Sequence, residues 1–229
     1  MVLIYSIEGS IGSGKSTIVE YMKSTIDEYK HLYKDLDETN PIIFLDEPIN
    51  VWNSIIDPSG ETILEKFYKD QEKYSFPFQM MAYITRISML KKAVKKYPNS
   101  IIVCERSVWT DRYVFAKMLF DTRKIETINF TIYIEWFNEF IEDIPIHRFI
   151  YMKASGEKCH ERIIKRNRKG ETIPIDYSKR CVEYHDSWLD MEKKKLVIDC
   201  NDDVEDNELL YKKFSDSIHD FIQKTKNEV

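Results

Sequence analysis

The residues with the clearest chemistry lie near the N-terminus, in the stretch GSIGSGKST. It satisfies the pattern G-x-x-x-x-G-K-[ST], directly after the apolar run VLIYSI and before a segment of helical period. In such a loop, backbone N–H groups converge on phosphate oxygens, and the following helix adds the positive end of its dipole. The lysine reaches the transferring phosphate, and the serine after it binds Mg²⁺. The residues of this predicted phosphate loop (9–17) are Gly9, Gly12, Ser13, Gly14, Lys15, Ser16 and Thr17.

Two further apolar runs each end in an acidic residue. Glu47 and Pro48 follow the run IIFL, and Glu105 and Arg106 follow the run IIVC. Because ligands gather at the carboxyl ends of parallel strands, we expect both acids to face the cleft beside the phosphate loop. A carboxylate there can accept a proton from an attacking hydroxyl or hold Mg²⁺ through water. We interpret Glu47 as the candidate base and Glu105 as the acid near the metal; surface ion pairs are the alternative.

Two helical faces predict a site for a planar heterocycle. The residues that share the first face are Phe78, Gln79, Ala82 and Arg86. Asp111 and Phe115 share a face on another helix, with Ser107 as its N-cap. An amide, a guanidinium and a carboxylate can read the edge of a base, while Phe78 and Phe115 supply a stacking surface.

The elements that must position these residues follow from the periodicity of the sequence. Short β-branched runs predict strands at 2–7, 42–45, 101–103, 149–152 and 196–198. Longer periodic segments predict helices at about 14–29, 61–69, 73–96, 108–119, 126–142, 156–166, 176–194 and 206–225. Strands separated by helices indicate a parallel sheet covered on both faces. We therefore predict an α/β protein with a single domain over residues 1–229.

A basic segment near residue 165 predicts a movable lid. The stretch RIIKRNRKGET, residues 162–172, runs from a helical pattern into a basic turn with Gly170, and Pro174 lies just beyond. This combination suits a lid. Alternatively, its arginines form a solvated helix face that interacts with Glu157 and Glu161.

The composition limits the class of protein. With 43% hydrophobic and 32% charged residues, the 229-residue chain has the balance of a soluble globular protein. It contains no apolar run long enough for a membrane span, and its N-terminus lacks the features of a signal peptide, so we expect a cytoplasmic protein without a membrane partner. The net charge of −5, without a basic block, argues against a nucleic-acid polymer as partner.

The four cysteines lack the paired spacing of a zinc site or a redox motif. They are Cys104, Cys159, Cys181 and Cys200. We expect reduced thiols with a structural role.

Taken in order along the chain, the motifs resemble those of the deoxynucleoside kinases of the cytidine/guanosine kinase type. The matching stretches are GSIGSGKST, EPINVW, FYKDQEKYSFPFQMMAYITR, ERSVWTDRYVFA and RIIKRNRKGETIP, which together cover nearly the whole chain. The resemblance implies a P-loop kinase fold with a five-stranded parallel sheet flanked by helices and a basic lid. It also implies a homodimer, with contacts through the helices at 73–96 and 126–142.

The resemblance implies a role for each matching residue. Glu47 matches the general base that takes the proton of the sugar 5′-hydroxyl, Arg106 matches the arginine that orients it, and Glu105 matches the acid near Mg²⁺. Tyr68 and Glu171 match the pair that contacts the 3′-hydroxyl, although Tyr68 is equally compatible with a core position. Residues implied to surround the base include Trp52, Phe78, Gln79 and Phe115. The implied lid arginines, which close on the donor phosphates, are Arg162, Arg166 and Arg168.

Substrate choice depends most on Ala82, Arg86 and Asp111. A carboxylate at Asp111 accepts from an exocyclic amine, whereas a thymine carbonyl would place two acceptors face to face. We therefore expect deoxyadenosine, deoxycytidine or deoxyguanosine to be preferred over thymidine, with Mg²⁺ and ATP or another nucleoside triphosphate as donor. Val204 stands where relatives often stack an aromatic ring on the donor adenine.

Two other functions compete with this interpretation. A thymidylate-type nucleoside monophosphate kinase shares a phosphate loop, but it has less use for a base at Glu47. A catalytically silent nucleotide-binding regulatory subunit is the second alternative. Intact Lys15, Ser16, Glu47 and Arg106 argue against it. For the dimer, the stripe of Ile128, Ile132 and Trp136 indicates either an interface or a helix face turned to the core.

Overall fold

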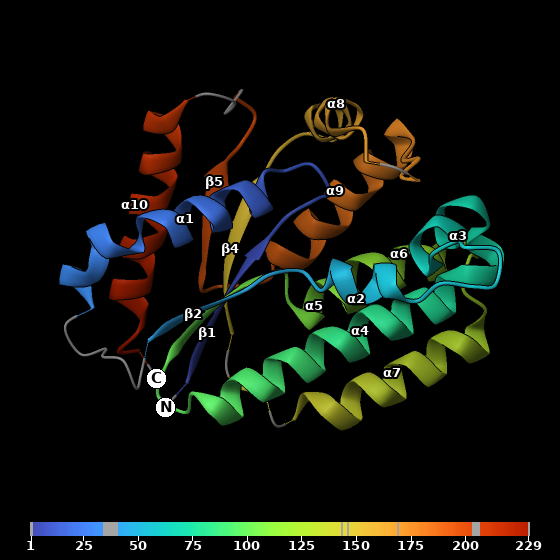
Figure 1. Cartoon of the computed structure of the whole chain (residues 1–229), viewed down its shortest axis with the longest axis horizontal. Coiled ribbons are helices and arrows are strands. Elements are labelled where there is room, and N and C mark those ends of the chain that lie inside the picture. Colours follow the sequence, from blue (N-terminus) through green and yellow to red (C-terminus); the bar gives the residue numbers. More distant parts are fainter. Residues whose placement is uncertain are drawn as a thin grey trace.

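The computed structural model describes residues 2–33, 41–142, 144–145, 147–168, 170–202 and 207–228. Within these residues, five strands form one parallel sheet in the order β2-β3-β1-β4-β5 (Figure 1). The strands are β1 (Leu3–Glu8), β2 (Ile42–Leu45), β3 (Ile101–Glu105), β4 (His147–Lys153) and β5 (Lys195–Asp199). The α/β class and the five predicted strands are confirmed, and four of the five strands extend beyond the predicted runs. Val204 lies outside the described residues, as does Lys169 within the predicted lid.

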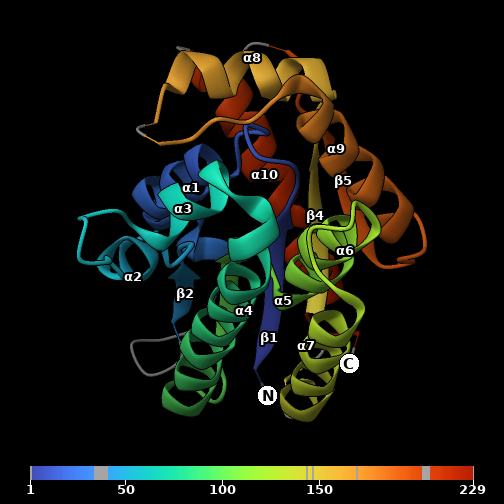
Figure 2. The ribbon, with the colours of Figure 1, turned by 90° about the vertical axis from the view of Figure 1, so that its right-hand side faces the viewer.

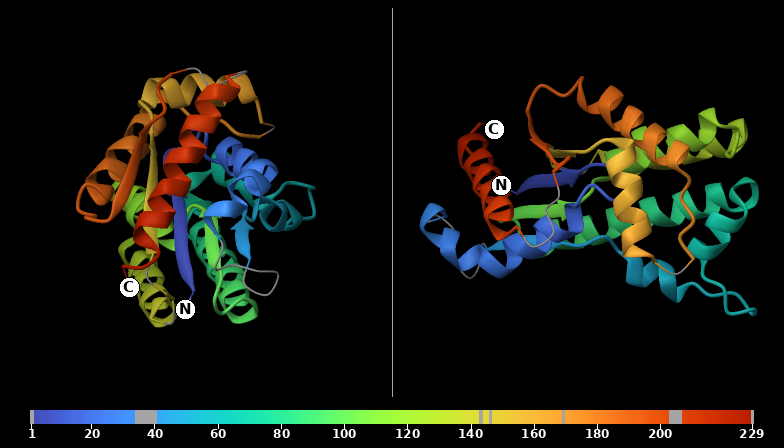
Figure 3. Two further views of the ribbon diagram at one scale, coloured as in Figure 1. Left: turned by 90° about the vertical axis from the view of Figure 1, so that its left-hand side faces the viewer. Right: turned by 90° about the horizontal axis from the view of Figure 1, so that it is seen from above.

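Helices cover both faces of the sheet. One face packs on α1 (Lys15–Tyr29) and α10 (Glu208–Thr225), the other on α4 (Gln71–Lys96) and α9 (Ile175–Leu189). In the left-hand view of Figure 3, α10 lies in front of the sheet and α4 lies behind it. The remaining helices are α2 (Ile49–Ser54), α3 (Ile63–Lys69), α5 (Val108–Thr110), α6 (Lys117–Asp121), α7 (Thr127–Ile141), α8 (Gly156–Arg166) and the 3₁₀ turn η1 (Lys30–Leu32).

The central strands are buried on both sides because their β-branched residues alternate between two helical layers. Tyr5 and Ile7 of β1 pack in the core beneath α1 and α10. Ile4 and Ile102 face the opposite layer and pack against Leu90 of α4. The cysteines lie within this framework: all four are buried and free of disulfides. None of the helices in the described ranges is long and apolar enough to cross a membrane.

Two elements differ from the sequence expectation. The helix predicted over 108–119 is divided into α5, a π-helical turn η2 (Asp111–Ala116) and α6. In that turn the Lys117 N–H donates to the Arg112 carbonyl, five residues earlier, so the turn is wider than an α-helical one. Helix α2 was not expected, because its six residues are too few to show a period.

Helix α8 lies across the carboxyl ends of the strands (Figure 2). It packs closely on α9, and a Cβ added to Gly156 would lie 2.6 Å from Lys179 Cα. After α8 the chain returns to α3: a Cβ at Gly170 would lie 2.6 Å from the Glu65 Cγ atom. The predicted lid therefore spans the sheet edge and touches the helix that carries Tyr68.

Candidate active site

A cavity of about 570 Å³ opens at the carboxyl ends of the strands. The phosphate loop lines one end, and aromatic side chains from α2, α3 and α4 line another part. With the exception of Gly9, the structure brings every predicted site residue to this one cavity. Gly9 begins the loop with a φ of 145°, where its backbone packs close to the Met152 carbonyl.

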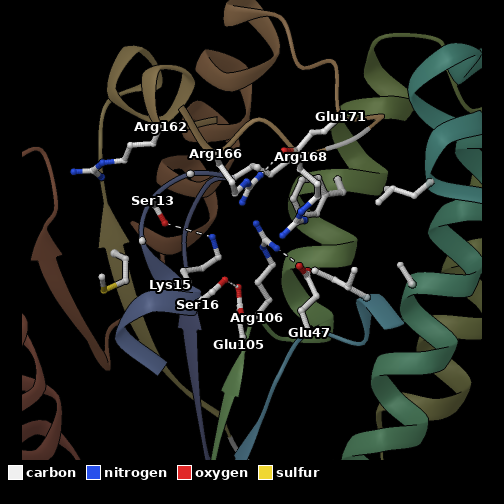
Figure 4. A pocket seen from close by; sticks show the side chains of 18 of the residues that line it. Ser13, Lys15, Ser16, Glu47, Glu105, Arg106, Arg162, Arg166, Arg168 and Glu171 are labelled. Carbon is white, nitrogen blue, oxygen red and sulfur yellow. Dashed lines mark hydrogen bonds and ion pairs between the residues drawn. The ribbon is translucent and has the colours of Figure 1, made fainter. Parts of the chain in front are cut away.

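The phosphate loop depends on glycines for its shape. Gly12 and Gly14 have φ angles of 84° and 94°, in the left-handed region that glycine adopts without strain. Lys15 Nζ donates to the Ser10 carbonyl at 2.6 Å and to Ser13 Oγ at 3.4 Å (Figure 4). Burial, together with the nearby Arg106, lowers the pKa of Lys15 to about 7. The lysine is thus held inside the loop by neutral oxygens. A bound phosphate would offer it negatively charged oxygens in their place.

Ser16 and Glu105 bring two hard oxygen donors together at the base of the loop. Ser16 Oγ donates to Glu105 Oε1 at 2.8 Å. No group of three or more potential metal-binding His, Cys, Asp or Glu residues occurs in the described part of the chain. This arrangement fits Mg²⁺, which binds through one or two protein oxygens and completes its shell with phosphates and water.

Glu47 lies between the phosphate loop and the aromatic pocket, held by two arginines. Its Oε1 accepts from Arg106 Nη1 at 2.6 Å and from Arg86 Nη2 at 3.1 Å. Burial acts to raise the pKa of Glu47, but the charges of Arg106, Arg86 and Lys15 outweigh burial and lower the pKa to about 2. The carboxylate is therefore ionised at neutral pH and can accept a proton.

Arg86 has more partners than the sequence suggests. Its Nε donates to Asp111 Oδ2 at 2.9 Å, its Nη1 to the Glu105 carbonyl at 2.9 Å, and its Nη2 to Glu47. One guanidinium thus joins the predicted base-reading acid to the predicted general base. Burial raises the pKa of Asp111 to about 6, against the opposing effect of Arg86.

The pocket wall is aromatic. The Phe67 and Phe78 rings stack with centroids 4.7 Å apart, and Trp52 meets Phe78 edge-on at 5.6 Å. Gln79 lines the cavity, and its buried Oε1 has no hydrogen-bond partner among the described residues, so it is available to a ligand donor. Sequence reasoning missed Phe67, although it lies next to Tyr68 in α3. Other lining residues that it missed include Ile11, Ile49, Leu64, Tyr177, Tyr211 and Phe214.

The lid residues do not all point the same way. Arg166 Nη2 pairs with Glu171 Oε2 at 2.5 Å, whereas Arg162 Nη2 donates to the Asp202 carbonyl at 2.6 Å. Figure 4 shows Arg166 and Arg168 extending toward the space above Lys15 and Glu47, and Arg162 extending away from it. The alternative partners of these arginines pair elsewhere: Glu157 with Lys179, and Glu161 with Lys158.

The turn after β3 begins its helix at the predicted N-cap residue but lacks the capping contact. Ser107 is the N-cap residue of α5, but its side chain makes no capping hydrogen bond. Arg112 stacks over the Phe137 ring and donates to Asn138 on α7, outside the cavity. Trp109 packs against the same Phe137 ring.

Comparisons with known proteins agree with this geometry. A family model described as deoxynucleoside kinase matches residues 5–223. A mitochondrial deoxyguanosine kinase of Xenopus laevis is 31% identical over 203 residues, 80% of this chain and 72% of the relative. A probable deoxycytidine kinase of Fowlpox virus is 32% identical over 229 residues, 96% of this chain and 88% of the relative. A deoxycytidine kinase of Homo sapiens is 27% identical over 249 residues, 95% of this chain and 90% of the relative.

Proposed function

The chain belongs to the deoxynucleoside kinase family and is a phosphotransferase of nucleoside salvage; we propose that it prefers deoxyadenosine, deoxycytidine or deoxyguanosine over thymidine. The phosphate comes from the γ position of ATP or another nucleoside triphosphate, and the acceptor is the sugar 5′-hydroxyl. One observation carries this proposal: a single cavity holds the phosphate loop at one end and an aromatic pocket with Asp111, with ionised Glu47 between them.

At the donor end, each proposed role follows from a contact in the cavity. Lys15 leaves the Ser10 carbonyl to contact the transferring phosphate, and Arg166 and Arg168 approach it from the lid. Ser16 and Glu105 would hold Mg²⁺, which would offset the charge of the donor phosphates. Arg162, held by the Asp202 carbonyl, reaches the phosphates only if it changes its side-chain conformation.

At the acceptor end, Glu47 accepts the proton of the 5′-hydroxyl, and Arg106 fixes the carboxylate that does so. Tyr68 and Glu171 bind the 3′-hydroxyl. Burial is the main cause that raises the pKa of Tyr68, and the charge of Glu171 adds to it. The phenol therefore stays protonated and can donate a hydrogen bond. Phe78 and Phe115 enclose the base, while Gln79 and Asp111 contact its edge.

A steady-state comparison of all four deoxynucleosides, with ATP and one other triphosphate as donor, tests the substrate proposal. Thymidine as best substrate would refute the base preference. Nucleoside monophosphates assayed in parallel separate this activity from a thymidylate-type kinase, since a faster reaction with monophosphates would favour that alternative.

The role of Glu47 is tested by Glu47→Ala, which removes the proton acceptor and leaves the aromatic pocket in place. We expect turnover to fall by roughly 100-fold or more, with nucleoside binding measured by calorimetry largely retained. Full turnover in this variant would show that the proton goes elsewhere.

The compartment remains a sequence-based prediction: we propose the cytoplasm, although the name of the Xenopus relative specifies mitochondria.

A further inference from the structure

A buried carboxylate outside the proposed catalytic set lies immediately before the phosphate loop. Glu8 ends β1 and is 0% exposed. Its Oε1 accepts a hydrogen bond from the Ser107 N–H at 3.0 Å, and its Oε2 accepts one from Thr110 Oγ1. Both partners follow β3, so this side chain ties the end of one central strand to the turn that leaves its neighbour.

That turn has an unusual backbone. Arg106 has a φ of 60°, in the left-handed region that residues with a Cβ seldom adopt. Its own N–H donates to the Ile7 carbonyl at 3.0 Å, and the next N–H in the chain is the one that Glu8 accepts. The residues on β1 before the phosphate loop therefore hold the Arg106 backbone through two consecutive amides. Such a conformation persists only where its surroundings fix it.

The conformation of this turn sets the direction of the Arg106 side chain. Arg106 Nη1 lies 2.6 Å from Glu47 Oε1, and its guanidinium stands over the Phe115 ring. If the backbone relaxed to an ordinary φ, the Cα–Cβ bond would point elsewhere, and this contact would be lost. The Ser107 hydroxyl makes no hydrogen bond among the described residues, so it adds no support to this turn.

We propose that Glu8 is a positioning residue for phosphoryl transfer, which fixes the left-handed turn at Arg106 and so holds the guanidinium against Glu47. This inference rests on the proposed roles of Glu47 and Arg106. Both carboxylate oxygens act as acceptors, one for a backbone amide and one for a hydroxyl. A glutamine can reproduce this pattern, since its amide oxygen accepts from Ser107 N–H and its NH₂ group donates to a rotated Thr110 hydroxyl. An alanine cannot.

The test compares Glu8→Ala and Glu8→Gln in the full-length enzyme by steady-state kinetics. We expect Glu8→Ala to lower kcat by about 100-fold, because the catalytic pair loses its alignment, with the KM for ATP within about threefold of wild type. Glu8→Gln should retain kcat within about threefold. Ile4→Val is the control: it removes a methyl group from a buried β1 residue on the α4 side, away from the turn, and should lower the melting temperature without changing kcat.

Three results would overturn the inference: wild-type kcat in folded Glu8→Ala, equal losses in the alanine and glutamine variants, or a rise in the KM for ATP with kcat unchanged. If Glu8→Ala does not fold, Thr110→Val and Thr110→Ser test the same hydrogen bond, and only the valine variant should lose kcat. Wild-type enzyme and Glu47→Ala are assayed alongside. Failure of the proposed function appears in those two proteins, whereas failure of the Glu8 inference appears only in the variants of Glu8 and Thr110.

Discussion

At the scale of single residues, the pKa values of the acids Glu47 and Asp111 depend on which arginines each of them contacts. Glu47 contacts both Arg106 and Arg86, and its pKa is lowered to about 2 despite burial. Asp111 has only Arg86 as an ion-pair partner in the described residues, and it shares that guanidinium with Glu47. Burial therefore prevails at Asp111 and raises its pKa to about 6. Two carboxylates on the same arginine thus titrate in different pH ranges.

The raised pKa of Asp111 leads to a prediction about base preference. Above pH 6 the carboxylate is ionised and accepts a hydrogen bond from an exocyclic amine; below pH 6 it is protonated and can donate to a carbonyl instead. We expect the ratio of kcat/KM for the best amine-bearing deoxynucleoside over thymidine to fall as the pH is lowered from about 7.5 to about 5.5. The four substrates are assayed at each pH in buffers of constant ionic strength.

Asp111→Asn supplies the control for that prediction, because its amide can donate at every pH. In this variant the ratio should be lower than wild type at pH 7.5 by about tenfold and should not change with pH. If the wild-type ratio stayed constant through pH 6, the ionisation of Asp111 would not set base preference.

At the scale of elements, the lid is joined to α3, the helix that carries the proposed sugar contact Tyr68. Gly170 has a φ of 77° and lies against Glu65, which forms the capping box of α3 with Thr62. Glu171 comes next in the chain and pairs with Arg166 of α8. A shift at Gly170 therefore affects α3 and the proposed sugar contact together.

Gly170→Ala should raise the KM for the nucleoside by roughly fivefold or more and lower the melting temperature. The new Cβ adds left-handed strain and lies 2.6 Å from the Glu65 Cγ atom. Gly60→Ala is a matched control, since Gly60 has a φ of 85° but has no atom within 4 Å of an added Cβ. That variant should carry only the backbone strain and retain its nucleoside KM. Equal KM values for both variants would argue against a functional contact between the lid and α3.

The elements also show what the sequence could and could not predict. All five strands and eight helical segments were expected, since β-branched runs and helical periods are local signals. The division of 108–119 into α5, η2 and α6 was not expected, because a π turn differs from an α-helical turn in its backbone hydrogen bonds, which residue types do not reveal. The glutamates at the ends of β2 and β3 were located correctly because parallel strands end at one edge.

At the scale of the whole molecule, one helical surface is left exposed. Ile128, Ile132 and Trp136 of α7 are 63%, 39% and 46% exposed, and Ile84 of α4 is 45% exposed. Tyr133 and Phe137 fill the core side of α7 instead. The predicted stripe therefore does not face the core, and we propose that this surface forms the interface of the homodimer predicted from the sequence.

Trp136→Glu tests the proposed dimer. A buried charge without a partner at the centre of this surface should shift the protein from dimer to monomer, measured by light scattering across a range of concentrations. Leu209→Glu is the control, because Leu209 is exposed on α10, away from this surface, and its variant should keep the wild-type mass. A monomeric wild-type protein, or an unchanged mass in Trp136→Glu, would count against an interface here.

The assembled site could be predicted only in part. Family motifs identified most residues of the cavity, yet the contacts that connect them join strands and helices distant in sequence. Arg86 bonds Glu47, Glu105 and Asp111 at once, and Glu8 reaches Ser107 from another strand. Such contacts leave no periodic signal, so they emerge only when the chain is folded.

The buried cysteines have a practical consequence. Burial raises the pKa of Cys181 and Cys200 to about 12, and Cys104 and Cys159 also have raised values. A thiol-reactive reagent can therefore modify this protein only when part of it opens. Cys159 of α8 lies against the phosphate loop, where its carbonyl packs close to Gly12. The rate at which a thiol reagent labels Cys159 therefore reports how often α8 separates from the phosphate loop. Mass spectrometry can measure this rate without an added fluorophore.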